Sequence, residues 1–152
     1  MVGPRPWALW LFRVVVSVEA VLAMGQAVLA GGFLAGHYGM LDLHAANAAA
    51  TAVTAVVLTV VAVVMWRPGG GAGWPAVACG ALFAVEGVQM GLGYGRVLLV
   101  HVPLGVSIIV CITLLLVWAW RTPPGGGKNQ RDLDRDLRDA VAMLEFSQEK
   151  SA

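Results

Sequence analysis

Residues 97–120 read VLLVHVPLGVSIIVCITLLLVWAW, a stretch without a single acidic residue, lysine or arginine. A helix needs about 20 predominantly apolar residues to cross a membrane, so this stretch predicts a membrane-spanning helix. Three other stretches, at about 8–34, 43–66 and 74–94, qualify in the same way. Of the 152 residues, 59% are hydrophobic and only 12% are charged, a balance that a water-soluble domain of this size does not reach.

Glycine and proline separate the four predicted spans, at residues 36–39, 67–71, 93–96 and 123–125. Short connections make consecutive helices antiparallel. We therefore predict an all-α, integral membrane four-helix bundle of up-down-up-down topology over residues 1–122. Residues 123–152 are predicted to form a Gly-rich linker and a short C-terminal amphipathic helix.

The basic residues favour one side of the membrane. Only Arg96 is predicted on the side opposite to the others, which are Arg5, Arg13, Arg67, Arg121, Lys128 and Arg131. By the positive-inside rule both termini are cytoplasmic. All six tryptophans are expected at the cytoplasmic ends of the spans. The apolar run to Leu34 is too long for the apolar region of a signal peptide, about 7–15 residues, so we interpret it as a retained helix.

The two halves of the chain share a pattern. Val18-Glu19-Ala20-Val21 in the first span matches Val85-Glu86-Gly87-Val88 in the third, and a Tyr-Gly pair precedes a histidine, His44 or His101, in each half. Two helical hairpins in the same orientation imply a pseudo-twofold axis along the membrane normal. The second and fourth spans then lie diagonally opposite, and their histidines face each other near the outer end of the bundle.

Two imidazoles at one depth are suited to hold a haem iron from both sides. Arg96, on the outer side, is placed to pair with a haem propionate. In the alternative interpretation, the histidines are interfacial residues that contact water or headgroups. A zinc or copper site formed by His37, Met40 and His44 is a further alternative, although Gly36 and Gly39 argue against a helix there.

Glu19 and Glu86 are each predicted near the middle of the membrane, about 18 Å from Trp7 and Trp74 along their helices. Intramembrane acids are costly and mark functional sites. They are candidates for proton transfer or for tuning a cofactor. Alternatively they are protonated acids that join helices by hydrogen bonds to Ser17, Gln26, Gln89 or threonines. Gln26 and Gln89 are themselves candidates for helix contacts or for support of the site.

The tail carries apolar residues at helical spacing, namely Leu133, Leu137, Val141 and Leu144. It is interpreted as a solvated helix or as a docking helix, over residues 129–146, for a membrane-complex or cytoplasmic protein. The formal net charge of +1 gives no argument for nucleic acid. Cys79 and Cys111 lie in apolar runs and are interpreted as small buried side chains rather than a disulfide.

The contexts Leu43-His44-Ala45-Ala46-Asn47-Ala48 and Val100-His101-Val102-Pro103-Leu104-Gly105 resemble one four-helix half of the haem A synthase family. They are also similar to small bacterial four-helix membrane proteins of unknown function. The resemblance covers roughly residues 10–120. It implies a haem b held by His44 and His101 in the bacterial plasma membrane. It does not carry over an enzymatic activity, because the synthases have two such halves.

The leading hypothesis is therefore a small b-type-cytochrome-like protein for electron transfer or redox sensing. A second hypothesis is a non-catalytic accessory subunit of a larger membrane complex, based on the tail and on the lack of a catalytic constellation. A third, a small transporter or proton path through Glu19 and Glu86, has little room in four helices. The sequence leaves open whether the chain is an enzyme, and it favours a non-enzymatic role.

Overall fold

The computed structural model describes residues 3–125, 134–135, 137–141 and 143. Four long helices follow one another in the chain: α1 (Pro6–Leu34), α2 (Met40–Trp66), α3 (Trp74–Tyr94) and α4 (Leu98–Arg121). Each is long and apolar enough to cross a membrane. The predicted all-α four-helix membrane bundle is confirmed, and each helix lies within three residues of its predicted bounds.

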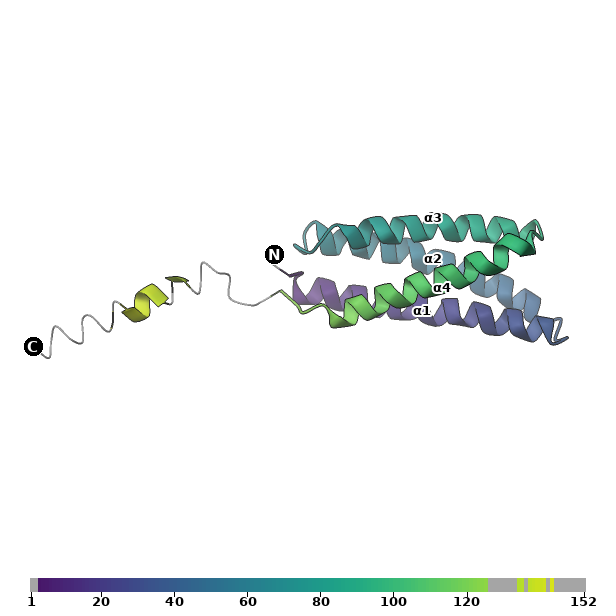
Figure 1. Ribbon diagram of the computed structural model, residues 1–152, viewed down its shortest axis with the longest axis horizontal. Helices are drawn as coiled ribbons and strands as arrows, with labels where there is room; N and C mark the ends of the chain where they lie inside the picture. The colour runs from purple at the N-terminus through teal and green to yellow at the C-terminus, as the bar shows by residue number, and fades with distance from the viewer. Residues whose placement is uncertain (1–2, 126–133, 136, 142, 144–152) are drawn as a thin grey trace, which may run out of the picture.

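The helices run alternately up and down along one common direction (Figure 1). Each helix contacts its two neighbours in the ring, and in the described residues neither α1 and α3 nor α2 and α4 contact each other through their backbones. The predicted diagonal relation between the second and fourth spans is therefore present. The pair α1 and α2 packs most extensively, and α3 and α4 pack least.

Turn chemistry sets the helix boundaries. Proline lies in the first turn of α1 and of α3, where its missing N–H costs no helical hydrogen bond. Gly36 and Gly70, in the first two connections, adopt positive φ angles of 96° and 72°, which favour glycine. The start of α1 lies beside the α2–α3 connection, where Arg5 N–H donates to Gly69 O (2.8 Å), and beside the end of α4, where Gly125 N–H donates to Pro4 O (2.6 Å).

We call this the tryptophan end, because the rings of Trp10 and Trp120 (5.6 Å) and of Trp74 and Trp118 (4.6 Å) meet there edge to face. Its core is densely filled by one apolar cluster from all four helices. Arg13 adds a polar contact: its guanidinium donates to the carbonyl oxygens of Ala119 (3.0 Å) and Thr122 (2.8 Å). These carbonyls belong to the last turn of α4, where a cation is favourable.

Phe12 fills the centre of this cluster, where it is 0% exposed and meets the Trp118 ring at 6.0 Å. We expect Phe12→Ala to lower the free energy of unfolding by about 2 kcal/mol. This is less than the 3–5 kcal/mol typical of water-soluble cores, because the unfolded helices stay in lipid and mainly the contacts around the cavity are lost. Unfolding by a denaturing detergent measures the loss. Phe83→Ala, at a position 42% exposed, is the matched control, and equal losses would contradict the assignment of the core.

The opposite end, which we call the histidine end, is packed differently. Among residues 24–50 and 87–107, none is buried. At the tryptophan end burial extends to Ala8 and Ala119, near the helix ends, whereas at the histidine end it stops at Ala23 in α1 and at Ile108 in α4. The fully buried part of the core therefore ends near the middle of the helices.

The short C-terminal helix is also present, with residues 134–135, 137–141 and 143 in helical conformation. Leu137, Val141 and Met143 are exposed. Leu133 and Leu144, two of the four apolar positions predicted to share a face, lie outside the described residues, as do Lys128 and Arg131.

Candidate functional site

The two repeat-related histidines face each other at the histidine end. His44 projects from the first turns of α2 and His101 from the first turn of α4. Their ring centres are 6.3 Å apart and their planes are inclined by 63°. Since α2 and α4 lie diagonally opposite, the two rings meet across the interior of the bundle rather than between neighbouring helices.

Backbone and side-chain contacts with Gln89 hold His101 in place. Nδ1 of His101 donates to the Gln89 carbonyl oxygen (2.9 Å), and Nε2 of Gln89 donates to the His101 carbonyl oxygen (2.8 Å). A carbonyl oxygen only accepts, so the ring proton is on Nδ1. The other ring nitrogen, Nε2, is left with a free lone pair, as a metal ligand requires.

Two glycines permit this arrangement. A Cβ atom on Gly93 would lie 2.9 Å from Cε1 of the His101 ring, and one on Gly105 would lie 2.7 Å from the Gln89 amide nitrogen. Both distances are shorter than carbon and nitrogen atoms tolerate. Glycine at position 93 therefore leaves room for the His101 ring, and glycine at position 105 leaves room for the Gln89 amide.

His44 has a related but less uniform setting. Its Nδ1 lies 3.2 Å from the Gln26 carbonyl oxygen, which accepts only if Nδ1 carries the ring proton. When the Gln26 amide is oriented so that its oxygen accepts from Ala48 N–H (2.7 Å), its nitrogen donates to the His44 carbonyl oxygen (3.2 Å) and lies 2.7 Å from Nδ1. Nδ1 of His44 therefore lies beside an acceptor, the Gln26 carbonyl oxygen, and a donor, the Gln26 amide nitrogen. Nε2 is free only in the tautomer in which Nδ1 carries the proton and donates it to the carbonyl oxygen.

The spacing of the rings fits a metal ion bound by both. A metal–imidazole bond is about 2 Å long, so an ion midway between two imidazoles places the ring centres about 6 Å apart. Within the described part of the chain, no three His, Cys, Asp or Glu side chains come together as a metal-binding group. His37, the proposed partner of Met40 and His44, is exposed in the α1–α2 connection. Two axial ligands, as for a haem iron, suit the pair better than a closed zinc site.

Compared with known proteins, the chain matches no protein family, no curated protein and no solved structure. The function is therefore inferred from the geometry of the site.

Three other predicted site residues complete the description. Glu19 of α1 and Glu86 of α3 lie on the other diagonal, deeper in the bundle, and both side chains are buried. The predicted alternative partners are engaged elsewhere, since Ser17 donates to the Arg13 carbonyl oxygen (2.7 Å) and Gln89 to that of His101. Arg96 is exposed in the turn between α3 and α4, with a φ angle of 56°.

Asn47 is a polar residue of the site to which the sequence analysis gave no role. It lies one turn beyond His44 in α2, and its Nδ2 donates to the Leu22 carbonyl oxygen (2.9 Å) in α1. A side-chain amide inside a membrane helix needs a hydrogen-bond partner. This requirement could have identified Asn47 from the sequence. The bond joins α1 to α2 just below the histidine pair.

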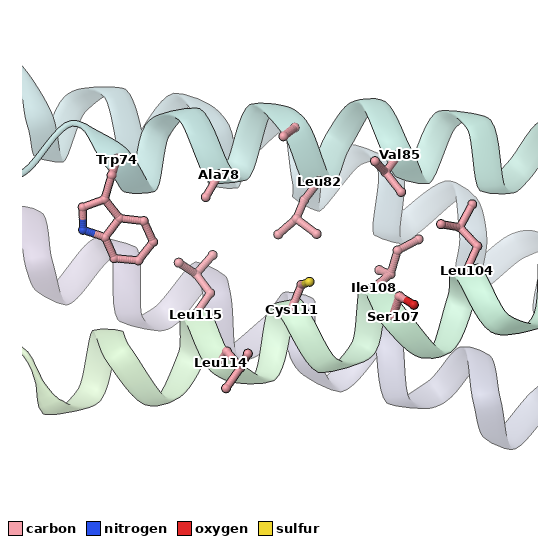
Figure 2. A pocket seen from close by; sticks show the side chains of 11 residues that line it. Trp74, Ala78, Leu82, Val85, Leu104, Ser107, Ile108, Cys111, Leu114 and Leu115 are labelled. Atoms are coloured by element: carbon pink, nitrogen blue, oxygen red, sulfur yellow. The ribbon is translucent and has the colours of Figure 1, made fainter.

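A cavity of about 410 Å³ lies between α3 and α4, the pair of helices that packs least. Its lining is almost wholly apolar, and Figure 2 shows Trp74 at one end and Leu104 at the other. Leu104 is three residues after His101 in α4, so the cavity extends to within one helical turn of the histidine pair.

Proposed function

We propose that this protein binds one haem b between His44 and His101 and serves as a small membrane electron carrier or redox sensor. The observation that carries the proposal is the pair of imidazoles, 6.3 Å apart, which meet across the bundle from diagonal helices. Bis-imidazole ligation of an iron in a helical bundle needs this arrangement. The likeness of the histidine contexts to one half of the haem A synthases supports the same cofactor.

The histidine end differs from the tryptophan end in its burial and in its side chains. None of the residues 24–50 and 87–107 is buried, although the same helices form a dense core at the tryptophan end. A well-folded bundle normally fills its interior with side chains. Small and amide side chains, including Asn47, Gly93 and Gly105, contribute to this part of the bundle.

The protein's own contribution is to hold two neutral imidazoles with Nε2 available. The Gln89 carbonyl oxygen accepts the Nδ1 proton of His101, and the Gln26 carbonyl oxygen is placed to accept that of His44 in the tautomer that leaves Nε2 free. Such a bond orients the ring and increases the basicity of its free nitrogen. Haem would supply a one-electron redox couple to this site. Arg96 is the residue that we assign to a propionate, because it is exposed at the same end of the bundle.

The orientation is also part of the proposal. Arg5, Arg13, Arg67 and Arg121 lie toward the tryptophan end, and Arg96 follows α3 at the histidine end. By the positive-inside rule the tryptophan end faces the cytoplasm, with both termini, and the haem lies near the outer face of a bacterial plasma membrane. The alternative role as an accessory subunit has no contact among the described residues that favours it.

The absorption spectrum of the purified protein tests the proposal. Protein expressed with ample haem is expected to show sharp reduced-minus-oxidised Soret and α bands, with one haem per chain in a pyridine haemochrome assay. Low-spin iron with two nitrogen axial ligands is expected by electron paramagnetic resonance. A colourless preparation that stays monodisperse and helical, and that does not take up added haemin, would refute the proposal.

A further inference from the structure

The most unusual buried groups of the bundle are the two carboxyls on the second diagonal. Glu19 is 1% exposed and Glu86 is 6% exposed, and they occupy equivalent places in the repeat, Val18-Glu19-Ala20 and Val85-Glu86-Gly87. They lie between the apolar cluster of the tryptophan end and the loosely packed histidine end. Glu19 is 12 residues after Trp7, about 18 Å along the helix, and thus near the middle of the membrane.

The rest of the described structure leaves these acids without donors. Both oxygens of Glu19 and Oε2 of Glu86 are fully buried and have no N–H or hydroxyl partner. Each acid projects from one of the two diagonal helices, α1 and α3, into the interior of the bundle. One ionised carboxylate without a donor is costly in a membrane interior, and two in the same bundle are prohibitively so. The pair therefore holds at least one proton.

A third unpaired acceptor connects the acids to the histidine site. Oε1 of Gln89 is buried without a donor, while Nε2 of the same amide donates to the His101 carbonyl oxygen. Gln89 follows Glu86 by three residues in α3, so the two side chains are neighbours on one helix face. Gln89 therefore lies between the acids in the middle of the membrane and the proposed haem ligand, and it is hydrogen-bonded to His101.

We propose that Glu19 and Glu86 form an intramembrane proton-binding site that takes up one proton when the histidine site gains one electron. The electron-linked part rests on the proposed function. In this coupled step an external one-electron donor would reduce ferric iron to ferrous iron. One proton from water would bind the ionised carboxylate of the pair. The net charge of the bundle interior then does not change, which in a medium of low dielectric constant favours joint transfer of both.

Among the described residues, the neighbouring titratable groups do not compete with the two acids as the site of proton uptake. Cys79, on the same helix, is the thiol that faces both carboxyls. The titratable groups that α2 and α4 bring to the interior at this end are His44 and His101, whose Nε2 atoms are assigned to iron. Within α1, Arg13 is committed to the end of α4.

Redox titration of the haem-loaded protein over a range of pH tests the coupling. Reduction binds a proton, so the midpoint potential is expected to fall as pH rises, by about 59 mV for each tenfold decrease in proton concentration within the coupled range. Glu19→Gln and Glu86→Gln keep the shape of the side chain but cannot ionise, and the double variant is expected to flatten this slope. Glu145→Gln in the tail makes the same chemical change and is expected to leave the slope intact.

Infrared spectroscopy of the protein in lipid vesicles reads the proton site without haem. A protonated-carboxyl band that shifts in deuterium oxide is expected in the wild type and in Glu145→Gln, and is expected to be lost in the double variant. Loss of both the band and the slope supports the inference. Bound haem with a slope that the double variant retains would overturn it. If no haem binds, the proposed function and the electron-linked uptake fail together, and the infrared band alone decides whether the carboxyls share a proton; its absence would overturn that part too.

Discussion

Replacing either His44 or His101 with alanine is expected to abolish the bis-imidazole haem signal of the purified protein. In the proposed site each ring supplies one of two axial ligands from opposite sides of the bundle, and no other histidine lies at this depth to substitute for it. Loss of one ligand leaves iron with a single protein bond, so the haem either dissociates or becomes high-spin. Absorption and electron paramagnetic resonance spectra measure both outcomes.

His37→Ala is the matched control for these two variants. His37 lies exposed in the α1–α2 connection, and its loss is expected to leave the spectrum unchanged. Each variant should keep the helical circular dichroism of the wild type, because the histidine end contributes no buried side chain to the fold. An unchanged spectrum in both His44→Ala and His101→Ala, or loss of haem in His37→Ala alone, would show that the assigned ligands are wrong.

A single methyl group at Gly93 is expected to weaken haem binding by about 10–100-fold, the range seen when the support of a metal ligand is disturbed. The Cβ of Gly93→Ala would lie 2.9 Å from Cε1 of His101 and 3.2 Å from its Nδ1. The ring cannot simply turn away, because its Nδ1 is bonded to the Gln89 carbonyl oxygen (2.9 Å). Titration of the haem-free protein with haemin measures the change in affinity.

Gly91→Ala is the control on the same helix, since a Cβ atom at Gly91 meets nothing within 4 Å. Both changes replace a helical glycine with alanine and raise helix propensity equally. The pair therefore separates an effect on the His101 ring from an effect on α3. Equal affinities in Gly91→Ala and Gly93→Ala would mean that the ring position described here is not the one that binds haem.

The sequence alone predicted the four spans because apolar length and turn residues are local signals. It also predicted that His44 and His101 oppose each other, since the repeat implied a pseudo-twofold axis and hence two diagonals. The same axis places Glu19 opposite Glu86. The lack of a hydrogen-bond donor for these carboxyls did not follow from the pattern, because the groups that reach them depend on side-chain packing.

The support of the histidines was less predictable. The atoms that orient the two rings are backbone carbonyl oxygens of Gln26 and Gln89, and every residue has such an oxygen. Gln26 follows Glu19 by seven residues, whereas Gln89 follows Glu86 by only three. The two glutamines are therefore not equivalent in the repeat, so their shared role is visible only once α1 and α3 are placed beside the histidines.

The uneven packing along the bundle has a consequence for how the protein is assembled in the cell. The tryptophan end is closed by the apolar cluster around Phe12 and by Arg13 on the last turn of α4. The contacts described in that half do not involve the histidine pair, so we expect the chain to insert and reach its topology before the proposed haem is bound. We therefore expect a stable precursor that is loaded late, with the sparsely packed α3–α4 seam as its loading route from the lipid.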